Sequence, residues 1–90
     1  RTLDLQPVQV QNSGFTDSQG TITVSATCPQ NYHVQSGNAQ ITPANQGQTP
    51  NYTISSNGPD AQKNTWSTTV ENKIAGSLSI TITATCAQKV

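Results

Sequence analysis

The feature that most constrains this chain is a strict alternation of apolar and hydroxyl side chains in two segments, each of which ends in a cysteine. Residues 22–28 read Ile-Thr-Val-Ser-Ala-Thr-Cys and residues 80–86 read Ile-Thr-Ile-Thr-Ala-Thr-Cys, so five of seven positions are identical. A period of two places one row of side chains on each face of a β-strand. We therefore predict half-buried strands at Thr21–Cys28 and Ser79–Cys86. Convergence of two β-rich strands explains their similarity better than a true internal repeat does.

Weaker alternation predicts further strands. The apolar positions 3 and 5 differ in parity from positions 8 and 10, so the pattern slips at Gln6-Pro7 and indicates a bulge or an edge strand there. Further strands are expected at residues 32–41, interrupted at 36–38, and at residues 52–54 and 66–70. Turn-rich stretches separate them at residues 12–20, 42–51 and 55–64, the last of which contains Asn57-Gly58-Pro59.

No segment has the 3.6-residue period of an amphipathic helix. The pattern predicts an all-β fold, a small antiparallel β-sandwich of about six or seven short strands. We expect the two isoleucine-rich strands to be central. With 90 residues, the chain has room for a single domain over residues 1–90, and its lack of methionine suggests a segment of something longer.

The two cysteines, Cys28 and Cys86, are 58 positions apart, which fits neither a CxxC redox pair nor the clustered ligands of a zinc site. They are either a structural disulfide or two buried thiols. The alternation favours the disulfide, because it puts both sulfur atoms at the same end of inward-facing rows. Closing so long a loop would stabilise the fold by about 4 kcal/mol. Because disulfides persist in oxidising surroundings, we expect an extracellular location, on a cell surface or a virion surface.

Composition limits the partners of the chain. Its net charge is zero, which argues against nucleic acid as a partner, and no apolar run is long enough for membrane insertion by a helix. Ser, Thr, Asn and Gln make up 42 of the 90 residues, whereas Leu, Ile, Val and Phe make up 16. Since so few large apolar side chains leave the core marginal, we predict a homo-oligomer.

Groups that could support catalysis are scarce. The only histidine, His33, lies in a predicted strand, and no motif places a serine as a nucleophile. Asp17 and Asp60 lie in predicted turns, where aspartate commonly caps its own backbone, and a calcium site would need more acidic ligands. We therefore predict no enzymatic activity, no cofactor and no metal site.

Hydroxyl and amide side chains dominate the predicted surface. Such groups suit hydrogen bonding to carbohydrate or to another protein, and they also suit solubility alone. Trp66 is either a core residue near the disulfide or a platform for stacking sugars, and its parity with Thr68 and Val70 favours the core. The predicted ligand-contact residues are Asn45, Gln46, Gln48, Asn51, Tyr52, Asn57, Asp60 and Trp66.

Three segments resemble a known domain. They are residues 26–37 (Ala-Thr-Cys-Pro-Gln-Asn-Tyr-His-Val-Gln-Ser-Gly), residues 66–72 (Trp-Ser-Thr-Thr-Val-Glu-Asn) and residues 78–87, which end in Cys-Ala. Together they resemble the C-terminal tip domain of trimeric bacterial and phage surface fibres, such as collagen-like surface proteins, adhesive trimers and tail fibres. The resemblance covers about residues 22–87. Asn31 stands where that family usually has glycine, and Gly37-Asn38 replaces a glycine pair.

The resemblance implies an extracellular β-sandwich with a Cys28–Cys86 bridge, assembled as a homotrimer at the end of a fibre and attached to a surface carbohydrate or protein receptor. We accordingly predict a non-enzymatic adhesion or receptor-binding tip domain. One alternative is a purely structural module that trimerises or caps a fibre, or a pilin-like subunit, without a ligand of its own. Another is an accessory carbohydrate-binding module of a secreted hydrolase, which would be monomeric and would depend on Trp66.

Overall fold

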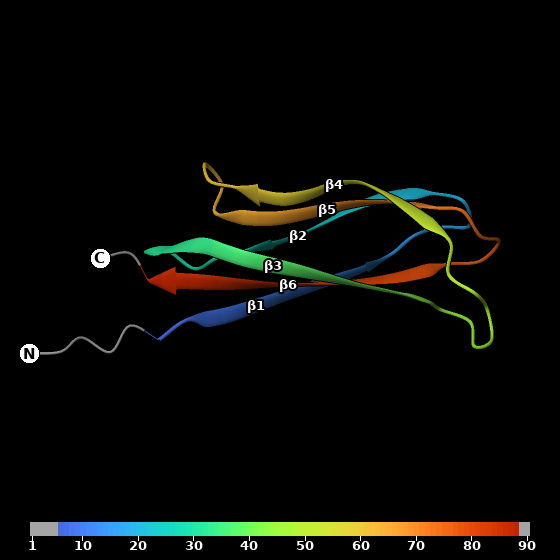
Figure 1. The fold of residues 1–90 in the computed structure, drawn as a ribbon, viewed down its shortest axis with the longest axis horizontal. Coiled ribbons are helices and arrows are strands. Elements are labelled where there is room, and N and C mark those ends of the chain that lie inside the picture. The colour runs from blue at the N-terminus through green and yellow to red at the C-terminus, as the bar shows by residue number, and fades with distance from the viewer. Residues whose placement is uncertain (1–5, 89–90) are drawn as a thin grey trace, which may run out of the picture.

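The computed structural model describes residues 6–88, and this part of the chain contains six strands and no helix. The strands form two antiparallel three-stranded sheets, in the orders β1-β6-β3 and β2-β5-β4, which pack face to face (Figure 1). The prediction of an all-β sandwich is confirmed. Residues 6–88 contain no helix that is long and apolar enough to cross a membrane. The strand bounds are β1 Val8–Phe15, β2 Thr21–Thr27, β3 Tyr32–Pro43, β4 Tyr52–Asp60, β5 Thr65–Asn72 and β6 Leu78–Gln88.

The first sheet has the isoleucine-rich strand β6 at its centre, paired with β1 on one side and β3 on the other. β1 is an edge strand, which agrees with the prediction made from Gln6-Pro7; positions 3 and 5 of that prediction lie outside the described residues. β3 is continuous, so the predicted interruption at residues 36–38 is wrong. Gly37 and Asn38 pair with Ala84 and Thr83, because a bulge between Val34 and Ser36 absorbs the irregularity.

The second sheet has β5 at its centre and β2 at one edge. The prediction that both isoleucine-rich strands are central is therefore correct for β6 and wrong for β2. The chain leaves β2 through a turn in which the Tyr32 backbone N–H donates to the Pro29 carbonyl at 3.2 Å. Asn31 has a φ of 72° in this turn, a left-handed conformation that Asn tolerates in place of glycine.

Most strands extend beyond their predicted bounds, and the difference is largest for β4 and β1. β4 continues to Asp60, so Asn57-Gly58-Pro59 lies in a strand and the predicted turn there is wrong. Pro59 is compatible with a strand because β4 is at an edge, where the missing N–H costs no ladder bond. β1 likewise continues to Phe15 and takes in the first part of the predicted turn at residues 12–20.

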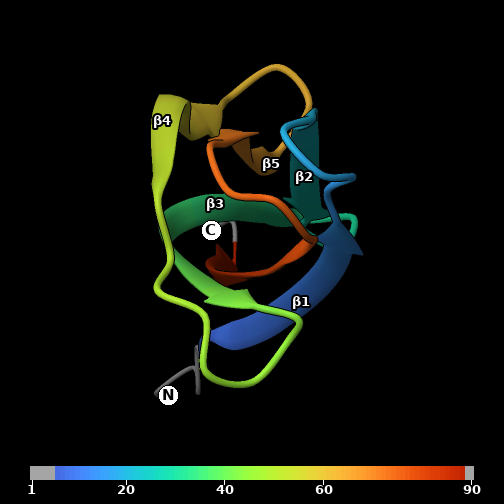
Figure 2. The ribbon, with the colours of Figure 1, turned by 90° about the vertical axis from the view of Figure 1, so that its right-hand side faces the viewer.

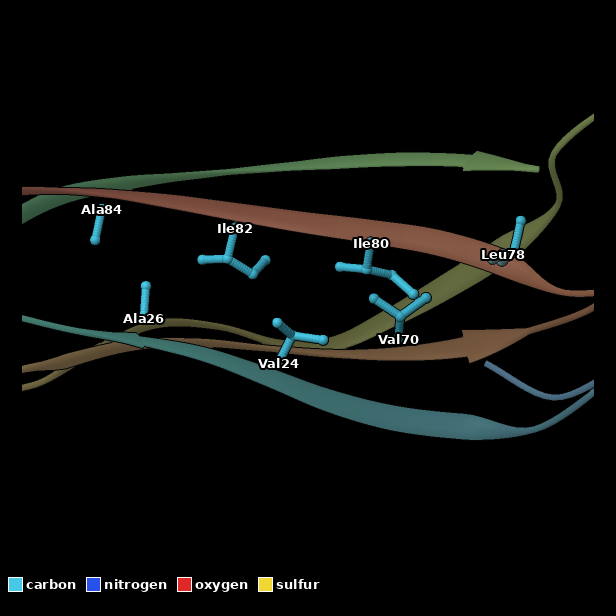
Figure 3. Packing of buried hydrophobic residues seen from close by; sticks show 7 residues of the cluster. All are labelled: Val24, Ala26, Val70, Leu78, Ile80, Ile82 and Ala84. Carbon is cyan, nitrogen blue, oxygen red and sulfur yellow. The ribbon is translucent and has the colours of Figure 1, made fainter. Parts of the chain in front are cut away.

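The core lies between the sheets and is built mainly on β6. Its inward-facing residues meet a smaller apolar row from β2 and β5. In Figure 3, the side chains of Ala84, Ile82 and Ile80 point toward those of Ala26, Val24 and Val70. A disulfide between Cys28 and Cys86, with Cα atoms 5.8 Å apart, joins the end of β2 to β6 and so links the two sheets. The predicted disulfide is confirmed. The core residues are Val24, Ala26, Val70, Leu78, Ile80, Ile82 and Ala84.

Candidate functional site

The predicted ligand-contact residues do not form one cluster. Asn45, Gln46, Gln48 and Asn51 lie in the connection between β3 and β4, and Tyr52 begins β4. The remaining three lie toward the other end of the molecule, at the end of β4 and the start of β5 (Figure 1). Strands rise about 3.3 Å per residue, so even the nearest members of the two groups, Tyr52 and Asn57 on β4, are separated by about 17 Å. These residues therefore cannot line a single small-molecule site.

Trp66 is turned into the sandwich. Its ring packs against the core and lies directly over Gly37 of β3, where an added Cβ atom would be 2.1 Å from the ring atom Cδ2. Its indole Nε1 donates a hydrogen bond of 2.8 Å to the Asn57 side-chain oxygen. This placement favours the core interpretation of Trp66 over the sugar-stacking one.

Asn57 and Asp60 also make internal contacts. Asn57 Oδ1 accepts a second hydrogen bond, of 2.9 Å, from the hydroxyl of the fully buried Thr68. Asp60 Oδ1 accepts from the backbone N–H groups of Gln62 and Lys63, at 3.0 and 3.3 Å, and so caps the turn between β4 and β5. Both side chains stabilise the local structure.

Gln48 holds the β3–β4 connection against the loop between β5 and β6. Its Nε2 donates to the Ala75 carbonyl at 2.6 Å, while Oε1 is buried without a hydrogen-bond partner. The backbone N–H of Lys73 donates to the Asn51 carbonyl in the same region. Exposed side chains with no hydrogen bond of their own among the described residues are Asn45, Gln46, Asn51 and Tyr52.

A buried polar network at this end of the sandwich was not predicted. Asn72 Nδ2 donates to the Thr16 hydroxyl at 2.9 Å and to the carbonyls of Asp17 and Gly76. Asn72 Oδ1 accepts from the Ile74 N–H at 2.9 Å. Asparagine is depleted in strands, so its place at the end of an alternating segment is the sequence signal that could have indicated this role.

Uncharged hydroxyl groups cover the outer face of the second sheet. Three hydroxyl pairs bridge β2 and β5 in register, with oxygen separations of 2.7 to 3.0 Å. On the outer face of the first sheet, Gln11 Nε2 donates to the Thr83 hydroxyl at 3.1 Å. The charged side chains of residues 6–88, including the Lys73–Glu71 ion pair, lie near the ends of the sandwich. The three pairs are Thr23–Thr69, Ser25–Ser67 and Thr27–Thr65.

Residues 6–88 enclose no detectable pocket. In that same part of the chain, no three His, Cys, Asp or Glu side chains lie close enough together to hold a metal ion. His33 is exposed on β3.

Comparisons of the chain with protein-family models, with curated proteins and with solved structures find no match. We therefore base a functional proposal on the outer faces and edges of the sandwich themselves.

Proposed function

We propose that this chain is a non-enzymatic adhesion or receptor-binding module at the tip of an extracellular trimeric fibre. The outer face of its second sheet would contact a surface carbohydrate or protein. The observation that carries the proposal is the array of hydroxyl pairs across β2 and β5, which presents neutral donors and acceptors in a fixed register. Thr65 is buried and donates to the Lys63 carbonyl, but the other five hydroxyls of these pairs keep acceptor capacity for a ligand. Carbohydrate hydroxyls are matched by groups of this kind.

The remaining architecture supports the same class of function. The Cys28–Cys86 disulfide suits an oxidising, extracellular setting. An uncharged face discourages non-specific electrostatic binding, so selectivity would come from the positions of hydrogen-bonding groups. Binding to an open face is expected to be weak for one chain, and three chains on one fibre would raise the overall affinity through avidity.

A purely structural capping, trimerisation or pilin-like module is the second candidate. It is favoured by one observation, that Gln48, Asn57, Asp60 and Trp66 have side chains engaged in contacts within the domain. Under this alternative, the hydroxyl faces provide solubility and no ligand is bound.

Binding of the unreduced domain to glycan arrays and to intact cells, with the domain displayed multivalently, tests the proposal. Thr69→Lys alters the outer face of the second sheet, and Thr83→Lys makes the matched change on the first. We expect Thr69→Lys to abolish binding and Thr83→Lys to retain it, with circular dichroism confirming that both fold. Failure of the unaltered domain to bind any glycan or cell would favour the structural alternative, as would equal binding by both variants.

A further inference from the structure

The strand β4 is the least covered of the six strands in the described part of the chain. Its six residues from 52 to 57 are all exposed, whereas the other strands place at least part of one row against the core. Tyr52 and Ile54 are 37% and 41% exposed, although their register partners on β5, Asn72 and Val70, are buried. The inward-facing side chains at the start of β4 are therefore not covered by the first sheet.

The edge of β4 is also unpaired along its backbone within residues 6–88. β4 is the last strand of its sheet and lies on the same side of the sandwich as the edge strand β3, as the end-on view shows (Figure 2). Proteins commonly protect such edges with lysine, proline or a bulge. β4 has a bulge between Ile54 and Ser56, and Pro59 near its end, but no charged side chain from Tyr52 to Pro59.

We propose that residues 52–58 of β4 form a contact surface for a second copy of this chain, which pairs an edge strand with β4 and covers Tyr52 and Ile54. This inference deepens the proposed function, on whose multimeric assembly it rests, by naming the surface through which copies meet. Strand addition of this kind gains its affinity from main-chain hydrogen bonds and its specificity from alternate side chains.

The chemistry of the edge fits a copy of the same chain. Thr53, Ser55, Ser56 and Asn57 carry groups that both donate and accept hydrogen bonds, so the surface is complementary to itself. A zero net charge and an uncharged edge avoid the like-charge repulsion that opposes self-association. Covering Tyr52 and Ile54 would also add apolar burial to a domain whose own core is small.

Light scattering tests the inference by measuring the mass of the unreduced domain over a range of protein concentrations. The range extends to about 1 mM, because a weak contact can have a dissociation constant of that order. We expect the mass to rise with concentration. Ile54→Lys should weaken association by about tenfold or more, as truncating an interface anchor does. Phe15→Lys is the matched control: Phe15 is 63% exposed at the end of β1, so this change removes more exposed apolar surface but should leave association unchanged.

Hydrogen exchange of the unaltered domain gives a second measurement that does not depend on a variant folding. Amides of residues 52–58 should gain protection as concentration rises, and those of β1 should not. The inference is overturned if the domain is a monomer at every concentration. It is also overturned if Ile54→Lys and Phe15→Lys weaken association equally, or if amides gain protection from exchange only outside β4. Glycan or cell binding by a strictly monomeric domain would preserve the proposed function without this inference. Association through β4 by a domain that binds no glycan or cell would support this inference and contradict the proposed function.

Discussion

Residues 22–28 and 80–86 have nearly the same sequence but occupy unlike places in the sandwich. Ile80 and Ile82, on the central strand β6, are completely buried. Ile22, the counterpart of Ile80, lies on the edge strand β2 and is only partly buried. The other inward residues of this segment, Val24, Ala26 and Cys28, are buried like their counterparts on β6. The alternation thus determines which side chains face inward, and the edge position of β2 shows mainly at Ile22.

The outer rows of the two segments differ in the same direction. Thr23 and Thr27 on β2 are exposed, whereas Thr81, Thr83 and Thr85 on β6 are partly covered by side chains of the strands on both sides. A central position therefore shields both faces of a strand, and an edge position leaves one side of each face open to solvent.

The largest effect is expected at the point where the two segments are joined. Replacing both cysteines, as Cys28→Ala with Cys86→Ala, should lower the free energy of unfolding by about 4 kcal/mol, because the unfolded chain is no longer closed into a long loop. Urea unfolding measures the loss. Reducing the disulfide of the unaltered domain should give a similar value. A loss below about 1 kcal/mol would show that the bridge does not couple the two segments.

The next comparison places one substitution at equivalent positions of the two segments. Ile80→Ala should cost about 3.5 kcal/mol, since it leaves a cavity in a closed core. Ile22→Ala should cost about half as much, because Ile22 is partly exposed and its truncation removes less buried apolar area than that of Ile80. Denaturant unfolding of both variants decides the matter. Equal losses would contradict the assignment of central and edge roles.

The buried asparagine of β5 holds the beginnings of both segments. Its backbone N–H donates to the Gly20 carbonyl before β2, and its side chain contacts Thr16, whose hydroxyl accepts from the Leu78 N–H at the start of β6. Asn72→Ala should therefore cost about 2 kcal/mol, since buried partners lose their hydrogen bonds.

Asn12→Ala is the matched control for this prediction. Asn12 is exposed; its Nδ2 donates to the Ser25 carbonyl at 2.9 Å, and its Oδ1 accepts from the neighbouring Ser13 N–H at 3.0 Å. We expect a loss of about 0.5 kcal/mol, because water can replace hydrogen bonds at an exposed site. If thermal unfolding shows equal losses for the two variants, the network around Asn72 does not stabilise the two strand starts.

The smallest effects are expected on the outer rows. Thr23→Val removes one member of the hydroxyl pair with Thr69, and Thr81→Val makes the same change at the equivalent position of β6. Each should change the free energy of unfolding by less than about 0.5 kcal/mol, as surface substitutions usually do. Thermal unfolding checks this. A larger loss would mean that the hydroxyl rows are structural, which would weaken the proposed role of the second sheet's outer face in binding.

Local pattern was sufficient to predict much of the fold. The all-β class, β2 and β6 with their inward rows, and the favoured disulfide all follow from alternation with a period of two. Pattern was misleading at Asn57-Gly58-Pro59. These are turn residues by propensity, and they lie in a strand because pairing with β5 extends to Asp60.

The candidate site was less predictable than the fold. The residues proposed for ligand contact were chosen for their polar side chains in expected loops, but a polar side chain can equally satisfy the domain itself. Asn57 does so for Trp66 and Thr68, and Gln48 does so for Ala75. The exposure of β4 could not be predicted, because it depends on how far the opposite sheet reaches.

The sequence by itself determined the features that depend on neighbouring residues: the strands, the faces they bury, and the inward direction of both sulfur atoms. Only the tertiary structure decided that β6 is central while β2 is an edge, that Trp66 packs over Gly37, and that β4 is left uncovered. The physical reason is that alternation is a property of consecutive residues. The position of a strand in a sheet is set by pairing between residues far apart in the chain, which nearly identical segments can satisfy in different ways.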